Sequence, residues 1–327
     1  MGKKIEWLSV LQGFSMLLVV IGHVSLTNIP RDPATPIATT IERCIYTFHM
    51  PLFIFISGWL FYHTCIRNGK SYGDMILSKL IRLGIPFLTF TLLATILKVL
   101  FPSLMHRTVT VQELLDTFLF FRSNPLGEMW FIVVLFVLML FYPCYVLCVK
   151  DKVTACFGLA AVVAVSMITP PHFCTILQID RVIHFAPFFI MGILCSRFDL
   201  QKYLSSGTFL SIASLCFAFF NVLIWLPDSC SLLTASVGII FSLSLCLNLT
   251  RIYPKAFASF RDYTFQIFLM GIFFQMVIRW IYTRFSIDAC FIPFYVLSVL
   301  VGIYAPVGIA RQIQKMAPVR IKRCFGL

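Results

Sequence analysis

The sequence predicts an all-α fold, a polytopic membrane helix bundle of about ten transmembrane helices with both termini cytoplasmic. Three observations lead to this prediction: the composition, the recurrence of apolar segments and the distribution of charge. Of the 327 residues, 60% are hydrophobic and 12% are charged, and the mean hydropathy is +0.93. Soluble domains average about 25% charged residues and about 45–50% apolar ones. A water-soluble globule of this length could not bury so much apolar surface, so lipid is the expected solvent.

Apolar segments that approach the ~20 residues of a spanning helix recur along the whole chain. Because backbone polar groups find no water in lipid, continuous apolar runs of this length predict helices. The first run has no clear small-residue cleavage site and is therefore interpreted as a span, not as a signal peptide. Even spacing predicts one domain, residues 1–327. The ten predicted spans are 7–26, 45–63, 84–102, 129–149, 153–169, 182–196, 207–226, 231–249, 263–283 and 291–310.

Charge gives the orientation. Most of the 26 lysine and arginine residues lie in short clusters between spans on one side, which the positive-inside rule assigns to the cytoplasm. The expected location is the inner (plasma) membrane. The clusters form no continuous basic face, so the expected partner is a lipid bilayer and no nucleic acid is expected. The longest outer connections are about 27–44 and 103–128.

The twelve cysteines form no C-x-x-C pair and lie mostly inside apolar runs. Free cysteine packs as a small hydrophobe, so these residues are expected to be buried and to form neither a disulfide framework nor a zinc site. No metal site and no bound cofactor are predicted.

Two histidines stand out near neighbouring span ends. His23 lies inside the apolar run L-L-V-V-I-G-H-V, where an ionisable residue is a functional-site hypothesis. It is roughly 24 Å along a helix from Trp7, in the outer half of the first span. His49 opens the second span from the outer side. Glu42 precedes it by seven residues and shares its helix face if the helix already begins there.

Further polar residues open later spans at the same outer level. Glu128 and Trp130 open the fourth span, and Arg181 and His184, three residues apart on one helix face, open the sixth. We expect these residues to form a polar cluster at one membrane level. The alternative is a set of interfacial anchors that reach toward water, with Trp130 in an aromatic belt.

On the inner side, Lys79 and Arg82 stand at the entry to the third span. Their side chains suit phosphate oxygens, and the alternative is ordinary positive-inside charge.

Several motifs carry a resemblance. They are V-V-I-G-H ending the first span, I-Y-T-F-H-M-P-L-F-I-F-I-S-G-W-L-F in the second and K-L-I-R-L-G-I-P-F entering the third, followed by E-M-W-F-I-V-V-L-F and F-A-P-F-F-I-M-G-I-L. Together they resemble the acyltransferase-3 family of integral membrane O-acyltransferases, most closely its fucose 4-O-acetylase-like branch. The resemblance covers nearly the whole chain.

The resemblance implies transfer of an acyl group, often acetyl from acetyl-CoA, to a sugar hydroxyl of a cell-surface glycan or its lipid-linked precursor. It maps the histidine required for activity to His23, the F-H-M-P-L histidine to His49 and the basic residue before I-P-F to Arg82. Members usually carry a basic residue and an acid where this chain has Gln12 and Ser9. They also commonly carry a late histidine, which this chain replaces near Met270-Gly271.

The predicted function is therefore a membrane O-acyltransferase, specifically an O-acetyltransferase, with acyl-CoA as co-substrate. A sugar hydroxyl is a poor nucleophile at neutral pH, so a base is needed, and His23 is the expected one. Glu42 or His49 would orient its imidazole or bind the sugar. Lys79 and Arg82 would bind the donor phosphates. The acceptor would be bound by Glu128, Trp130, Arg181 and His184.

Three alternatives stay open on the sequence alone. An acyl-His23 relay could replace direct transfer. A transporter or flippase for a lipid-linked sugar would also need many spans, although broken midplane helices and repeated halves are not evident. The third alternative is a catalytically inactive family member, suggested by Gln12 and Ser9.

Overall fold

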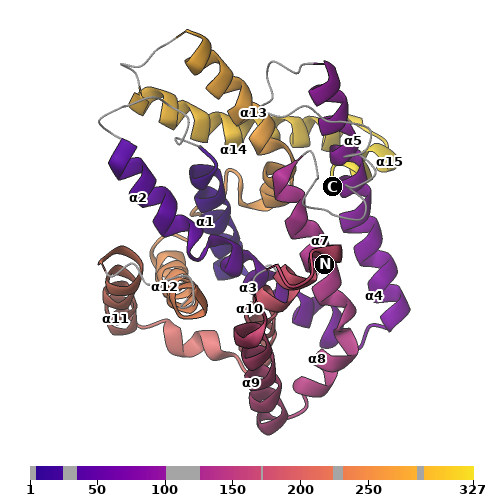
Figure 1. The fold of residues 1–327 in the computed structure, drawn as a ribbon, viewed down its shortest axis with the longest axis vertical. Coiled ribbons are helices and arrows are strands. Elements are labelled where there is room, and N and C mark those ends of the chain that lie inside the picture. The colour runs from indigo at the N-terminus through magenta and orange to yellow at the C-terminus, as the bar shows by residue number, and fades with distance from the viewer. Residues whose placement is uncertain (1–4, 25–34, 101–125, 171, 224–230, 286–290) are drawn as a thin grey trace. The chain divides into compact units, whose positions relative to one another are not determined.

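The computed structural model describes residues 5–24, 35–100, 126–170, 172–223, 231–285 and 291–327. Within these ranges every regular element is a helix and no strand occurs (Figure 1). The all-helical fold predicted from the apolar runs is therefore confirmed for this part of the chain.

Six described helices are long and apolar enough to cross a membrane: Thr40–Ile66, Tyr72–Leu97, Ile176–Arg197, Ser231–Ile252, Arg261–Tyr282 and Ile292–Met316. The pair Gly127–Leu140 and Tyr142–Cys148, bent by 59°, is a seventh if it forms one span. Shorter apolar helices are Glu6–Gly22, Lys152–Ile168 and Gly207–Asn221. Each predicted segment coincides with one of these helices. The multi-pass helical bundle is thus confirmed, while ten spans and cytoplasmic termini stay predictions.

Two helices begin earlier than the sequence predicts. The connection predicted at 27–44 contains α2 (Thr35–Tyr46), in which Ile41 and Ile45 lie four residues apart on one face, a helical pattern that overall hydropathy does not reveal. The third predicted span, 84–102, belongs to a helix that starts at Tyr72.

The early start of that helix has a local cause. The Ser71 hydroxyl accepts a hydrogen bond from the backbone N–H of Asp74 at 3.2 Å and caps α4 (Tyr72–Lys79). After α4 the chain passes through a π-helical turn, η2 (Leu80–Gly84), into α5 (Ile85–Leu100). Lys79 and Arg82 consequently lie within a helix and not in the loop before one.

The chain forms two compact units. Unit 1 comprises Met1–Phe53 and Gln201–Ala317, and unit 2 comprises Ile54–Leu200 and Pro318–Leu327. The helix α3 (His49–Phe61) starts in unit 1 and continues into unit 2. A single domain over residues 1–327 stays a prediction.

In unit 1, α1 (Glu6–Gly22) packs against α2, α12 (Ser231–Ile252), α13 (Thr264–Arg284) and α14 (Phe291–Met316). The helices α13 and α14 lie side by side, as do α12 and α11 (Gly207–Ala218) (Figure 1). One apolar core joins α1 to the C-terminal hairpin and consists of Met16, Val19, Val20, Phe260, Ile267, Ile303 and Val307. This packing holds the C-terminal end of α1 in place.

In unit 2, α10 (Ile179–Arg197) packs against α7 (Trp130–Leu140) and α9 (Lys152–Ile168). It also crosses α3 closely. A Cβ added at Gly58 would overlap the carbonyl group of Phe189, and one added at Gly192 would overlap the carbonyl group of Phe55. Glycines at such crossings let two backbones touch, which is how helices in membranes pack most tightly.

The cysteines correct one expectation. Within the described ranges Cys65, Cys195 and Cys246 are buried, whereas Cys144, Cys156 and Cys216 are exposed. A small apolar side chain can face hydrocarbon at little cost, so membrane helices need not bury it.

Candidate active site

The C-terminal end of α1 is held by side chains from three other helices. Gln275 of α13 donates from Nε2 to the carbonyl oxygen of Val20 at 2.9 Å. The hydroxyls of Tyr295 and Tyr46 lie 3.4 Å from the carbonyl oxygens of Ile21 and Gly22, long and therefore weak contacts. The last carbonyls of a helix lack partners within the helix and need them from elsewhere in lipid. These contacts fix the backbone that carries His23.

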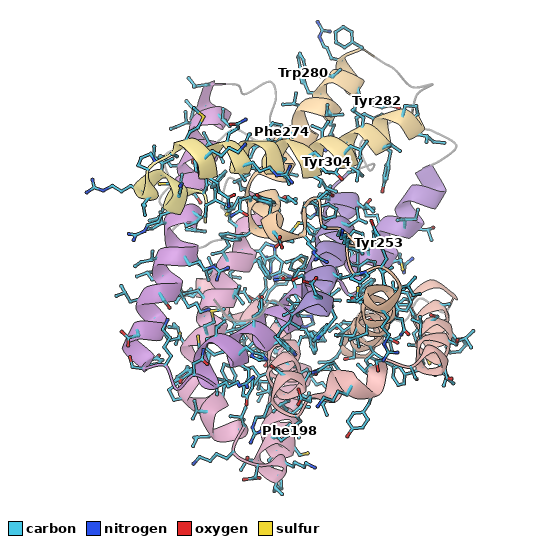
Figure 2. All side chains as sticks on the ribbon, turned by 180° about the vertical axis from the view of Figure 1, so that it is seen from behind. Phe198, Tyr253, Phe274, Trp280, Tyr282 and Tyr304 are labelled. Atoms are coloured by element: carbon cyan, nitrogen blue, oxygen red, sulfur yellow. The ribbon has the colours of Figure 1, made fainter. Side chains whose placement is uncertain are left out.

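His23 is the residue that follows the last turn of α1. Its N–H donates to the carbonyl of Val19 at 3.0 Å. The next residue, Val24, is buried in a cluster with Tyr282 and Phe294, whose rings stack at 4.1 Å (Tyr282 is labelled in Figure 2). The backbone on either side of the half-buried His23 is thereby held in place, by α1 before it and by the packing of Val24 after it.

The ring of Tyr46 lies near the rings of both His23 and His49. Tyr46 stacks on His23 with centroids 6.3 Å apart and planes 16° apart, and it meets His49 edge-on at 4.8 Å. A charge on His23 is close enough to act on His49. The structure therefore brings together the two histidines that the sequence singled out, and one aromatic ring contacts both.

His49 is 2% exposed, and its Nδ1 lies 2.9 Å from the carbonyl oxygen of Ile45. A carbonyl oxygen only accepts, so Nδ1 carries the proton of this bond and Nε2 of the neutral ring keeps a lone pair. The bond fixes both the ring orientation and the tautomer.

Glu42 lies on α2 in the same unit. It is half-buried, and its charge acts on Tyr295, whose hydroxyl contacts the end of α1. Glu42 and His49 lie within one apolar helical stretch, Thr40–Ile66, which the turn Thr47–Phe48 divides into α2 and α3, so a shared face stays a prediction.

η10 (Arg261–Tyr263) and the residues just before it pack against α1. A Cβ added at Gly13, in the middle of α1, would lie 2.6 Å from the Cβ of Phe257 and 3.0 Å from that of Arg261. The guanidinium of Arg261 donates to Glu6 at 2.7 Å and to the carbonyls of Pro254 and Ala256. An ion pair thus joins the first turn of α1 to a segment far along the chain.

Unit 2 holds the basic residues predicted to bind the donor. Two other cations, Arg82 and Lys70, lie close enough to Lys79 to act on its charge. Lys70 donates to the hydroxyl of Ser78 at 2.9 Å, and its carbonyl accepts from Tyr142 at 2.8 Å. Three cations gathered around one helix entrance form a suitable site for an anion.

Unit 2 also holds the four residues predicted to bind the acceptor. The guanidinium of Arg181 lies 4.4 Å from the centre of the Trp130 ring, a cation–π pair, and Phe185 stacks on the same tryptophan at 5.4 Å. His184 meets Phe185 edge-on at 5.1 Å. Glu128 lies in η5 (Gly127–Met129), the turn directly before α7. Trp130 is therefore already engaged by α10.

Sequence reasoning missed two residues at these sites. Tyr46 lies four residues before M-P-L in I-Y-T-F-H-M-P-L, and only the fold shows that its ring contacts both histidines. Gln178 precedes α10 in η6 (Ile176–Gln178) and is fully buried. A lone glutamine among apolar residues was the available signal. His23 and His49 belong to unit 1, whereas Lys79, Arg82 and the cluster around Trp130 belong to unit 2.

Residues 5–311 match the family model described as an acyltransferase domain. Two curated relatives are similar over 123 residues, or 37% of this chain: the nodulation protein NolL of Mesorhizobium japonicum, 32% identical, and that of Sinorhizobium fredii, 31% identical. The matched stretch spans 30% and 31% of these two proteins. No solved structure matches the chain significantly.

Proposed function

Because the chain belongs to the acyltransferase-3 family, we propose that it is a membrane O-acyltransferase that takes an acyl group from cytoplasmic acyl-CoA. The acyl group is acetyl, and the acceptor is a sugar hydroxyl of a cell-surface glycan or its lipid-linked precursor. The enzyme acts in the inner (plasma) membrane. It belongs to the fucose 4-O-acetylase-like branch of the family, whose motifs it resembles. Acetyl-CoA is a co-substrate and not a bound cofactor.

The contacts of Tyr46 with His23 and His49, at the end of α1, are the observation that carries this proposal. His23 accepts the proton of the sugar hydroxyl while the sugar oxygen bonds to the thioester carbonyl carbon. The carbon–sulfur bond then breaks, and the proton passes from His23 to the departing CoA thiolate. A positioned base of this kind contributes about 10²–10⁴-fold.

His49 and Glu42 support this step. The bond from Nδ1 of His49 to Ile45 holds its ring against Tyr46, so that Tyr46 keeps His23 oriented. Glu42 supplies negative charge on the same helix as Tyr46, which favours the imidazolium that forms at His23 during transfer.

Two groups of residues in unit 2 support separate binding roles. Lys79 and Arg82, joined by Lys70, bind the phosphates of the donor through their positive charge. Glu128, Trp130, Arg181 and His184 bind the acceptor through hydrogen bonds and an aromatic surface.

The test is transfer of radiolabel from acetyl-CoA to the glycolipids of membranes that contain the protein. His23→Ala is expected to lower the rate by about 10²–10⁴-fold, because the base is lost. His172→Ala, an exposed histidine outside the helices, is the matched control and is expected to keep the wild-type rate. Equal rates for His23→Ala and the wild type at equal protein level would remove His23 from the mechanism.

Deletion of the protein from cells separates the other functional classes. A normal amount of surface glycan that lacks acyl groups supports the acyltransferase. A loss of the glycan itself points to a transporter or flippase. Wild-type membranes that transfer no label point to an inactive family member.

A further inference from the structure

Gln178 carries a fully buried side-chain amide. It is 0% exposed, and neither its Nε2 nor its Oε1 has a hydrogen-bond partner within the described part of the chain. A buried amide almost always has a partner, because leaving it without one costs the full desolvation penalty of the group. An amide kept in this state needs a role.

Its surroundings place it among the acceptor residues. The turn η6 that carries Gln178 packs against both α7 and α10. Arg181, whose guanidinium lies on Trp130 at the start of α7, follows Gln178 by three residues. At the far end of α10, Arg197 donates to the carbonyl of Val149 at 3.1 Å, so Gln178 lies at the end of α10 away from that contact.

The turn itself is short and carries surface residues. Ile176 and Leu177 are 51% and 45% exposed, directly before the buried amide. Leu177 and Gln178 both have left-handed backbone angles, with φ of 50° and 58°, which only the surrounding packing maintains. A one-turn segment of this kind opens locally far more easily than the core helices on which it rests.

We propose that the amide of Gln178 is a binding site for two neighbouring hydroxyls of the carbohydrate acceptor, an inference that rests on the proposed function. A planar amide presents a donor and an acceptor side by side, which matches a vicinal diol that can accept at one oxygen and donate from the other. Such groups explain why a site rejects analogues that lack a hydroxyl, because the amide is then left without its partners. The Arg181–Trp130 pair borders the same subsite.

The experiment measures sugar binding without any acyl donor. The full chain in lipid nanodiscs is titrated with dodecyl glycosides of glucose, mannose, fucose and N-acetylglucosamine, with dodecanol as the comparator that has no sugar. Gln178→Met keeps the size of the side chain and removes the amide. Ser196→Ala is the matched control, because Ser196 is also on α10, is 5% exposed and has a hydroxyl without a partner among the described residues.

At least one glycoside is expected to bind the wild type more tightly than dodecanol. Gln178→Met is expected to weaken that binding about tenfold, as the loss of one or two hydrogen bonds predicts, while Ser196→Ala leaves it unchanged. Equal binding by Gln178→Met and the wild type overturns the proposal, and so does a wild type that binds none of the glycosides.

A second measurement needs no variant and so does not depend on folding of Gln178→Met. Monodeoxy derivatives of the bound glycoside are titrated against the wild type, and removal of either hydroxyl of one vicinal pair is expected to weaken binding about tenfold. Equal binding of all monodeoxy derivatives overturns the subsite. Label transfer from acetyl-CoA is measured separately in the same nanodiscs, so loss of the acyltransferase proposal is distinguished from loss of the sugar site.

Discussion

Tyr46 contacts both histidines of the candidate site. Its ring contacts both, and its hydroxyl lies 3.4 Å from the carbonyl oxygen of Gly22, next to His23. The hydroxyl contributes little, because a 3.4 Å hydrogen bond is weak and its acceptor belongs to Gly22 and not to His23. We therefore assign its positioning effect on His23 to the ring and not to the hydroxyl.

Replacement of Tyr46 tests this assignment. Tyr46→Phe keeps the ring and is expected to retain the transfer rate within about threefold, whereas Tyr46→Leu is expected to lower kcat roughly tenfold, because a misplaced catalytic group slows the reaction steeply. The KM for acetyl-CoA should not change in either variant. Steady-state kinetics in purified membranes measure both. An equal loss in the two variants would instead assign the effect to the hydroxyl.

At the scale of elements, the crossing of α3 and α10 depends on two glycines. Each faces a carbonyl group of the other helix, Gly58 that of Phe189 and Gly192 that of Phe55. The same crossing positions α10, whose first turns carry Arg181 and His184. Packing at the middle of α10 therefore bears on the site at its N-terminal end.

Gly192→Ala is expected to lower the stability of the protein by about 1–3 kcal/mol, the usual cost of overpacking, because neither backbone can give way cheaply. Gly308→Ala is the matched control, since a Cβ there meets nothing within 4 Å on α14. That substitution is expected to be neutral or to stabilise by up to about 1 kcal/mol through helix propensity. Thermal unfolding in detergent measures both, and equal melting temperatures for the two variants would contradict the role of the crossing.

The start of α9 is fixed by a capping box. Asp151 accepts hydrogen bonds from the N–H groups of Val153 and Thr154, both at 2.9 Å, and the Thr154 hydroxyl lies 3.3 Å from the N–H of Asp151. The backbone bond from Thr154 is the main reason why the pKa of Asp151 lies below its usual value. The bonds favour the charged carboxylate.

The pH dependence of this cap follows from that direction. A carboxyl with a lowered pKa in the folded state stabilises the cap above its unfolded pKa and loses the effect as the pH falls through the folded pKa. Thr154→Val removes one hydroxyl contact and is expected to raise the pKa of Asp151 partly toward its usual value. NMR titration of aspartate carboxyl carbons measures the change, and an unaltered pKa would exclude a contribution from the hydroxyl.

At the scale of the whole molecule, orientation stays a prediction from charge. Basic clusters are retained on the cytoplasmic side during insertion, so both termini are expected there. Green fluorescent protein fused after Leu327 is expected to fluoresce, and alkaline phosphatase at the same position to be inactive. Phosphatase fused after Leu126, before the bent helix pair, is expected to be active. Active phosphatase after Leu327 would reverse the assigned orientation.

Much of the architecture could be predicted because lipid imposes a local rule. Each apolar run must satisfy its own backbone, and each of the ten predicted segments is accordingly occupied by a helix. The boundaries were less predictable. The early starts at Thr35 and Tyr72 go with the spacing of Ile41 and Ile45 and with the Ser71 cap, neither of which alters mean hydropathy.

The sequence by itself determined that the chain is helical and apolar enough to cross a membrane. It also identified candidate site residues, namely His23, His49, Glu42, Lys79 and Arg82. These follow from composition and from ionisable groups placed in or beside apolar runs. Only the tertiary structure decided that Tyr46 contacts both histidines, that glycines join α3 to α10 and that Gln178 is buried without a partner among the described residues. Such contacts join segments far apart in the chain, and they depend on how whole helices pack, which no local pattern records.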